Sequence, residues 1–161
     1  MKKKIVLLIL FCFPCILSAQ STELIKFEDL KSRITDSNDT LYVLNFWATW
    51  CKPCILELPF FENCNAIYQN KKIKIILVNL DFHSQVNNVV NPFIQKKNIR
   101  ASVLHLTDTN SDLWINKVDS NWSGAIPATS MYKNGKKMFF KEGSFTEKEL
   151  INVLELQLLK Y

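Results

Sequence analysis

The segment that decides the fold lies in the first half of the chain and reads Trp47-Ala48-Thr49-Trp50-Cys51-Lys52-Pro53-Cys54-Ile55-Leu56-Glu57-Leu58-Pro59. Two residues separate its cysteines, and a helical pattern of apolar residues begins at the first of them. The N-terminus of a helix stabilises a thiolate, because its N–H groups are unpaired and its dipole end is positive. The spacing therefore indicates that Cys51 is a nucleophile and that Cys54, one turn further along, is the resolving thiol.

The residues around the two cysteines fit the same chemistry. Pro53 lies where the first turn of a helix tolerates proline, and it restricts the turn that presents the pair. We expect Trp47 and Trp50 to shield the site and to offer a flat apolar surface to a partner.

Two apolar runs of β-prone residues predict strands that are buried on both faces, at residues 41–47 and 73–80. Helical spacing over residues 27–34 precedes the first strand, and a polar loop over residues 35–40 separates this helix from that strand. After Cys51 a helical stripe continues through Phe61, Cys64, Ile67 and Tyr68. The order indicates alternating helices and strands.

The second half of the chain adds five predicted elements. A helical pattern runs from about residue 85 to residue 97, but Asn91-Pro92 interrupts it, so the helix is expected to begin near Pro92. The five elements are a helix beginning near Pro92, a short strand over 102–106, a short helix over 112–118, a hairpin of 128–133 and 136–141, and a final helix. Asn134-Gly135 is a strong hairpin signal, and Thr146-x-x-Glu149 is a capping box for the final helix. Together the elements predict a three-layer α/β domain with a parallel start and an antiparallel hairpin at the sheet edge.

The N-terminal residues have the layout of a secretory signal peptide. Three lysines at positions 2–4 precede a thirteen-residue apolar run over residues 5–17, and small and polar residues follow. A membrane-spanning helix needs about 20 apolar residues, so an uncleaved anchor is the lesser alternative. We expect a signal peptide over residues 1–19, a single domain over residues 20–161, and export from the cytoplasm.

Composition and charge exclude several classes of protein. The chain has 161 residues, is 48% hydrophobic and contains 3 glycines, which excludes a disordered or collagen-like chain. Removal of residues 1–19 would leave 17 basic against 15 acidic side chains, a net charge of +2. Its lysines form only short pairs rather than a basic face with interleaved aromatics, so no nucleic-acid partner is expected.

Two other uses of the cysteine pair fit the sequence less well. A structural zinc site takes four ligands, and the remaining candidates, Cys64, His83 and His105, lack the spacing of metal ligands. A purely structural disulfide between Cys51 and Cys54 would close a loop so small that it adds little stability. We therefore expect no metal site.

The segment from Trp50 to Pro59 resembles the thioredoxin superfamily, and in particular its exported TlpA/ResA-like branch of thiol-disulfide oxidoreductases. That branch is marked by W-C-x-P-C-x-x-E-x-P, which residues 50–59 match. The resemblance extends to residues 45–49 and to Ile126-Pro127-Ala128-Thr129, and it covers most of residues 40–160. It implies a thioredoxin-like three-layer α/β/α fold with a mixed central sheet.

The resemblance also implies roles for single residues. Pro127 matches the cis-proline that faces the disulfide in this superfamily, and the backbone of Ile126 would pair with a substrate strand. Trp50, Pro53, Ile126 and Pro127 are therefore the expected substrate-binding residues. Thioredoxin carries a buried aspartate where this chain has Asn45, which cannot shuttle a proton.

Glu57 is the expected third catalytic residue. It lies three residues after Cys54, and helical side chains lean back toward the N-terminus, so its carboxylate can approach the Cys54 sulfur and take its proton. A solvated helix glutamate is the alternative that spacing alone favours. Its E-x-P context and the absence of the aspartate favour a role in catalysis.

The predicted activity is dithiol-disulfide exchange without a cofactor, and the resemblance implies that it runs in the direction of reducing protein disulfides. The resemblance implies a disulfide-bearing protein substrate, a membrane thiol-transfer protein as electron donor, and a process such as cytochrome c maturation. We expect a monomer.

Three alternatives would use the same fold. An exported oxidase or isomerase would have a higher reduction potential, and a non-catalytic binding module would have lost the chemistry. A peroxiredoxin wants Thr or Ser three residues before its reactive cysteine, where this chain has Ala48, so peroxidase activity is disfavoured.

Several other residues carry no predicted chemistry. Cys64 is expected to be a buried, inert thiol, and His83 and His105 to be structural or surface residues. Asp81 follows a strand and could face a ligand. Trp122 lies in the loop that leads to Ile126, with a role in either packing or partner contact.

Overall fold

The computed structural model describes residues 21–35 and 39–159, so the predicted signal peptide lies outside the described residues. A six-stranded sheet with the order β1-β4-β3-β2-β5-β6 forms its centre. Its strands are β1 (Glu23–Ile25), β2 (Leu41–Trp47), β3 (Ile73–Asn79), β4 (Ser102–Leu106), β5 (Ala128–Lys133) and β6 (Lys136–Glu142). The pairs β1–β4, β4–β3 and β3–β2 are parallel, whereas β5 is antiparallel to both β2 and β6. The mixed sheet with a hairpin at its edge confirms the prediction.

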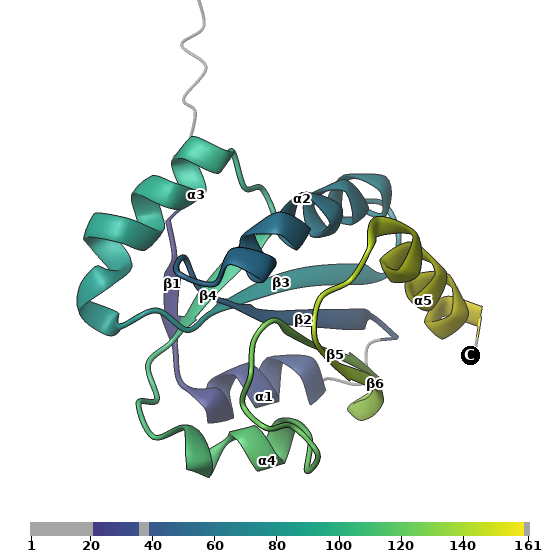
Figure 1. Cartoon of the computed structure of the whole chain (residues 1–161). Helices are drawn as coiled ribbons and strands as arrows, with labels where there is room; N and C mark the ends of the chain where they lie inside the picture. Colours follow the sequence, from purple (N-terminus) through teal and green to yellow (C-terminus); the bar gives the residue numbers. More distant parts are fainter. Residues whose placement is uncertain (1–20, 36–38, 160–161) are drawn as a thin grey trace, which may run out of the picture.

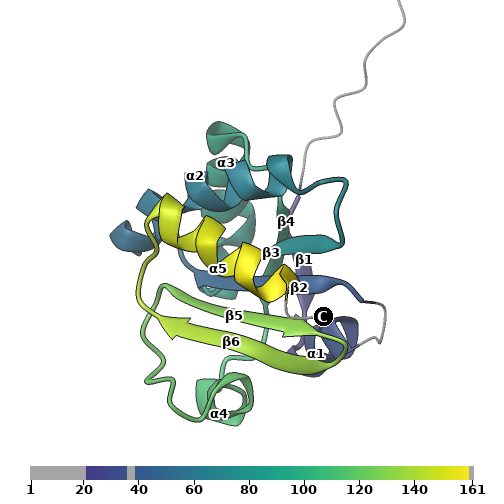
Figure 2. The ribbon, with the colours of Figure 1, turned by 90° about the vertical axis from the view of Figure 1, so that its right-hand side faces the viewer.

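Helices cover both faces of the sheet. One face carries α2 (Lys52–Ile67), α3 (Asn91–Lys97) and α5 (Glu147–Leu159), and the other carries α1 (Phe27–Thr35) and α4 (Ile115–Val118) (Figure 1, Figure 2). This arrangement confirms the three predicted layers. Within the described part of the chain, no helix is long and apolar enough to cross a membrane.

Strand β2 shows why the sheet has two cores. All seven of its residues are buried, and successive side chains of a strand point to opposite faces. Leu41, Val43 and Trp47 join the core under α2, α3 and α5, whereas Leu44 and Phe46 join the core over α1 and α4. The continuous apolar run of β2 therefore serves both layers at once.

The hairpin and the final helix form as their local signals predict. Asn134 and Gly135 have φ angles of 50° and 73°, the two positive values that a tight turn of this type requires. The Thr146 hydroxyl accepts a hydrogen bond from the N–H of Glu149, and the Glu149 carboxylate accepts one from the N–H of Thr146. Both elements depend on contacts within a few residues.

The structure departs from the sequence prediction in three places. The short edge strand β1 was not predicted, because three residues carry too little pattern. A helical path begins at His83, before Pro92: one π-helical turn over Val86–Val90 leads directly into α3. In that turn the N–H of Asn91 reaches the carbonyl of Val86, so the chain stays helical up to the proline, which lacks an N–H. Ile67, expected in the buried stripe of α2, is 60% exposed at the end of that helix.

Candidate active site

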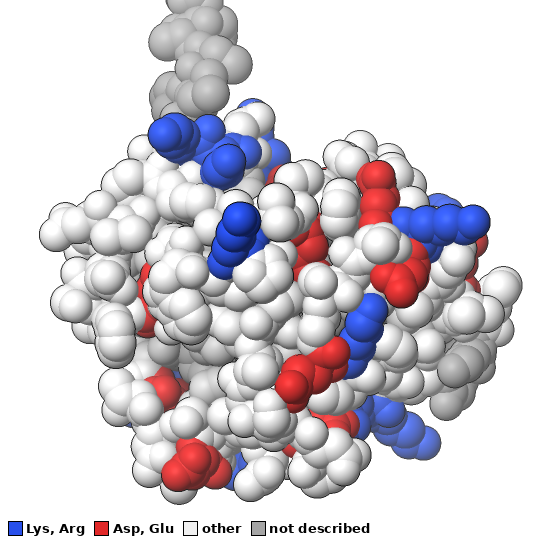
Figure 3. All heavy atoms as spheres, in the orientation of Figure 1, with Lys and Arg blue, Asp and Glu red and all other residues white. Residues whose placement is uncertain are grey.

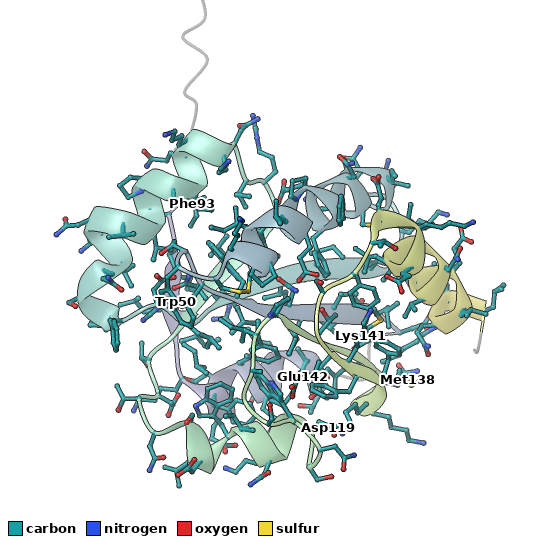
Figure 4. All side chains as sticks on the ribbon, in the orientation of Figure 1. Trp50, Phe93, Asp119, Met138, Lys141 and Glu142 are labelled. Carbon is teal, nitrogen blue, oxygen red and sulfur yellow. A yellow bond between two sulfur atoms is a disulfide. The ribbon has the colours of Figure 1, made fainter. Side chains whose placement is uncertain are left out.

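The two cysteines of the motif form a disulfide at the start of α2, with their Cα atoms 5.3 Å apart. Cys51 caps the helix, and its Sγ accepts a hydrogen bond from the N–H of Cys54 at 3.3 Å. Pro53 lies in the first turn, where its missing N–H leaves no bond unmade. Figure 4 draws the disulfide as a yellow bond at this end of α2. The pair lies where the sequence predicts.

The two sulfurs differ in accessibility. Cys51 is 5% exposed and Cys54 is fully buried. When the pair is reduced, the N–H group that contacts Cys51 Sγ and the positive end of α2 favour a thiolate at Cys51. An incoming disulfide therefore meets Cys51 first.

The segment that precedes β5 also reaches the disulfide. The Ile126–Pro127 peptide bond is cis, as the resemblance implies. The carbonyl oxygen of Ile126 lies 3.6 Å from Cys51 Sγ, and β5 begins directly afterwards and pairs with β2. The sheet thereby fixes the backbone of Ile126 beside the sulfur that a substrate would approach.

Glu57 is buried, so the solvated alternative is wrong. Its Oε1 accepts a hydrogen bond from Asn45 Nδ2 at 2.7 Å, and its Oε2 accepts one from the N–H of Phe145 at 2.7 Å. Burial raises the pKa of Glu57, while these two hydrogen bonds and the charge of Lys141 oppose the rise. The carboxyl group lies one helical turn from Cys54, on the same buried side of α2.

Asn45 has a part in the site that the sequence did not reveal. Besides Glu57, its amide donates to the hydroxyl of Thr129 in β5, and its Oδ1 is buried with no hydrogen-bond partner among the described residues. From the sequence, Asn45 is only the residue that stands where thioredoxin has an aspartate. Because side chains alternate along β2, Asn45 lies on the same face as Val43 and Trp47, toward α2. This alternation is the signal in the sequence that could have placed Asn45 in the site.

The loop that carries the first cysteine is fastened by Asp81. The N–H and the hydroxyl of Thr49 both donate to the Asp81 carboxylate, and Asn79 Nδ2 donates to it as well. Asp81 is 5% exposed. Its role here is to hold the backbone two residues before Cys51.

The tryptophans divide between core and surface. Trp50 is 64% exposed and Pro53 is exposed, so both can contact a partner, whereas Trp47 is fully buried. The expectation that Trp47 offers a surface is therefore wrong, because β2 is covered on both faces. Trp122 is also buried: its ring lies 4.7 Å from that of Phe46 and its Nε1 donates to Ala125, which assigns it to packing.

The third described cysteine, Cys64, lies away from the disulfide in the core under α2. Cys64 is free and buried, and burial raises its pKa to about 11, as fits an inert thiol. No group of three or more His, Cys, Asp or Glu side chains among residues 21–35 and 39–159 could hold a metal ion. His105, by contrast, is buried in a polar network rather than isolated.

Comparison with known proteins places this geometry among thioredoxin-like proteins. A family model described as the AhpC/TSA family matches residues 16–133. The thiol-disulfide oxidoreductase ResA of Oceanobacillus iheyensis is 32% identical over 115 residues, which cover 71% of this chain and 55% of that protein. The chain thus aligns with little more than half the length of that relative.

Two solved structures share the architecture. StoA from Bacillus subtilis is 26% identical with a TM-score of 0.57, and the match covers 71% of this chain and 81% of that one. A thiol:disulfide interchange protein of the thioredoxin family from Chlorobium tepidum is 19% identical with a TM-score of 0.64, covering 80% and 84%. The second likeness concerns the fold alone, and it confirms the predicted thioredoxin-like fold.

Proposed function

The chain belongs to the AhpC/TSA family of thioredoxin-like proteins, and on that premise we propose that it is a thiol-disulfide oxidoreductase that reduces protein disulfides. The observation that carries the proposal is the Cys51–Cys54 disulfide at the N-terminus of α2, with the Ile126 carbonyl 3.6 Å from the Cys51 sulfur. The relative from Oceanobacillus iheyensis is named as a thiol-disulfide oxidoreductase, which supports the same assignment.

The reaction proceeds by two exchanges. The Cys51 thiolate attacks one sulfur of the substrate disulfide; a mixed disulfide forms, the substrate S–S bond breaks, and the other substrate sulfur leaves as a thiolate. Cys54 then loses its proton and attacks Cys51 Sγ, which expels the second substrate thiolate and closes the Cys51–Cys54 disulfide. Two electrons pass from the protein to the substrate, whose thiolates take up protons. The exchange needs no metal or organic cofactor.

Glu57 accepts the proton of Cys54 in this mechanism. Its two hydrogen bonds from Asn45 and Phe145 occupy one lone pair on each oxygen, so further lone pairs are left for the thiol proton. Burial raises the pKa of the Glu57 carboxyl group and so brings it closer to the pKa of a thiol, which favours proton transfer between the two groups.

The substrate strand lies against Trp50, Pro53, Ile126 and Pro127. Trp50 and Pro53 are exposed beside Cys51, and the backbone of Ile126 is available to pair with an extended polypeptide. Such pairing would deliver a substrate disulfide to Cys51 Sγ.

We place the reaction outside the cytoplasm. The signal-peptide layout of residues 1–19 supports export, with the domain beginning at residue 20. In an oxidising compartment the spent disulfide must be reduced again, so the proposed electron donor is a membrane thiol-transfer protein. Cytochrome c maturation is the process that the TlpA/ResA-like resemblance suggests, and the proposed oligomeric state is a monomer.

Reduction of insulin disulfides tests the activity, with dithiothreitol as the electron source. Wild type should accelerate the reduction, and Cys51→Ser should abolish that acceleration. Equal rates with both proteins would instead favour a non-catalytic binding module. Consumption of hydrogen peroxide faster than insulin reduction would favour a peroxidase.

Equilibration with glutathione distinguishes a reductase from an oxidase or isomerase. A reductase has a reduction potential near that of thioredoxin, about −270 mV, whereas a value near that of DsbA, about −120 mV, would overturn the proposed direction. Cys54→Ser should stall as a mixed disulfide, and mass spectrometry of the trapped species identifies the substrate.

A further inference from the structure

A hollow of about 520 Å³ opens beside the disulfide, at the carboxyl ends of the parallel strands β3 and β4. We call it the His105 pocket; its lining includes Trp50, Ile126, His105, Asp108 and Asp112. Trp50 directly precedes Cys51, and the Ile126 carbonyl lies 3.6 Å from Cys51 Sγ. A polypeptide whose disulfide reaches Cys51 therefore lies across this pocket.

Part of the lining of the pocket is apolar. Trp50 and Phe82, both in the lining, are 64% and 74% exposed, and Trp114 and Ile126 add further apolar surface. Exposed aromatic side chains at the edge of a pocket can cover the methylene stem of a long side chain. The pocket thus suits a side chain that is apolar along its length.

The polar part of the pocket begins with His105, which is 1% exposed. Asn79 Oδ1 accepts a hydrogen bond from the N–H of Asp81, which fixes the orientation of the Asn79 amide. The hydrogen shared between Asn79 Oδ1 and His105 Nδ1, 2.9 Å apart, therefore belongs to Nδ1.

The second nitrogen of His105 is consequently an acceptor. Burial, and next the neighbouring His83, lower the pKa of His105, which keeps the ring neutral and Nε2 unprotonated. Nε2 has no hydrogen-bond partner among residues 21–35 and 39–159, and it is the edge that His105 can present to the pocket it lines.

Two carboxylates of the lining also offer hydrogen-bond acceptors. Asp112 forms no side-chain hydrogen bond or ion pair with any described residue, and of the two Asp108 oxygens only Oδ2 is engaged, by the N–H of Phe27. The lining contains no lysine or arginine. In Figure 3 red carboxylates at the lower left of the molecule lie around the start of α4, and other red side chains lie at its centre and upper right. The larger blue groups lie above α3, at the centre, and toward α5 and β6.

We propose that the His105 pocket selects substrates that carry a lysine or arginine close to the disulfide to be reduced. The cationic head donates hydrogen bonds to His105 Nε2 and to the carboxylates of Asp108 and Asp112, while the stem packs on Trp50. The selection rests on the proposed reductase function and names the substrate class for that same site.

Three peptides that differ in one side chain test the selection. Their sequence is Ala-X-Ala-Cys-Ala-Ala-Cys-Ala-X-Ala with an internal disulfide, and X is lysine, its uncharged analogue norleucine, or glutamate. The second-order rate constant of peptide reduction by the prereduced protein is measured at pH 8. Wild type should reduce the lysine peptide about tenfold faster than the norleucine peptide, the effect of one hydrogen bond to a charged group.

Variants of Asp112 locate the effect. Asp112→Asn should lower the ratio of lysine to norleucine rates to about threefold, because Asp108 and His105 still accept hydrogen bonds from the cationic head. Asp112→Lys should raise the rate of the glutamate peptide relative to the norleucine peptide. Glu155→Gln, an equal change of charge on the exposed side of α5, is the matched control and should keep the tenfold preference.

Equal rates for the lysine and norleucine peptides with wild type would overturn the selection and leave the reductase function intact. A lysine preference that is unchanged in both Asp112 variants would also overturn it, because Asp112 would then take no part in the selection. Failure to reduce any of the three peptides would contradict the reductase function itself.

Discussion

Replacement of Glu57 by glutamine should slow the second exchange of the reaction and leave the first one unchanged. The Glu57 carboxylate accepts hydrogen bonds from Asn45 Nδ2 and from the N–H of Phe145, and Glu57 lies one turn from the resolving thiol Cys54. Glutamine preserves the size of the side chain but cannot accept a proton. The variant therefore removes the proton acceptor without emptying the site.

The expected loss of rate is about a hundredfold. A positioned general base contributes about 10² to 10⁴ in rate, and the lower end applies because one lone pair on each Glu57 oxygen is already used. The attack by Cys51 should change by less than about twofold, because its thiolate is stabilised by the start of α2 rather than by Glu57.

The variant should fold, because Asn45 can adapt to it. Glutamine offers one acceptor oxygen, which can serve the N–H of Phe145, and its amide then needs an acceptor near Asn45. Asn45 Oδ1 has no partner among the described residues, so turning the Asn45 amide supplies one. The cost should be about 1 kcal/mol, the usual net value of one hydrogen bond.

Stopped-flow absorbance with Ellman's reagent separates the two exchanges. Attack by Cys51 releases a first coloured thiolate, and attack by Cys54 on the mixed disulfide releases a second. Glu57→Gln should slow only the second phase, with Glu155→Gln as the control of equal charge change. An unchanged second phase would remove Glu57 from the mechanism, and equal slowing of both phases would show that Glu57 acts on Cys51 instead.

The same variant predicts a pH dependence of stability. Burial raises the pKa of Glu57 above 4.5 in the folded protein, so the carboxyl group binds a proton more tightly in the folded than in the unfolded state. The contribution of this raised pKa to the free energy of unfolding is complete below pH 4.5 and is lost as the pH rises through the pKa of Glu57 in the folded state. The free energy of unfolding of Glu57→Gln should therefore improve relative to wild type as pH rises from 4 to 8. A difference that stays constant across this range would contradict the direction of the shift.

Three further predictions concern the surrounding structure. Asp81→Asn keeps one acceptor for the two donors of Thr49 and should lower the free energy of unfolding by about 1–3 kcal/mol, measured with urea; an unchanged midpoint would contradict the fastening role. Gly135→Ala should cost about 1–2 kcal/mol, because φ is 73° and the new Cβ would lie 3.0 Å from the Thr35 carbonyl, and an unchanged melting temperature would refute this. Cys64 should react with iodoacetamide at pH 8 about a hundredfold more slowly in the native oxidised protein than after unfolding, since its pKa rises from 9.0 to about 11. Equal rates would show that Cys64 is accessible.

Several features of the fold and the site follow from short stretches of the sequence. The positions of Cys51 and Cys54 at a helix start, the strand β2 and the turn at Asn134 follow from patterns within about ten residues. Each depends on hydrogen bonds or side-chain periodicity that neighbouring residues settle between themselves. Such features were predictable because no distant segment has to be placed first.

The state of Glu57 is different in kind, because its partner Phe145 is 88 residues away in the chain. Its burial, and with it the direction of its pKa shift, depends on how α5 and the loop before it close over α2. Likewise the hydrogen bond from His105 to Asn79 exists only because β3 and β4 pair in one register. No local pattern records these contacts.

The sequence by itself thus determined the reactive pair, its helix and the class of fold, since short-range backbone and side-chain preferences specify them. The tertiary structure alone decided which polar groups are buried together and which remain without partners among the described residues, such as Asn45 Oδ1. Desolvation and hydrogen bonding between distant segments set the properties of those groups, and both arise only when the layers pack.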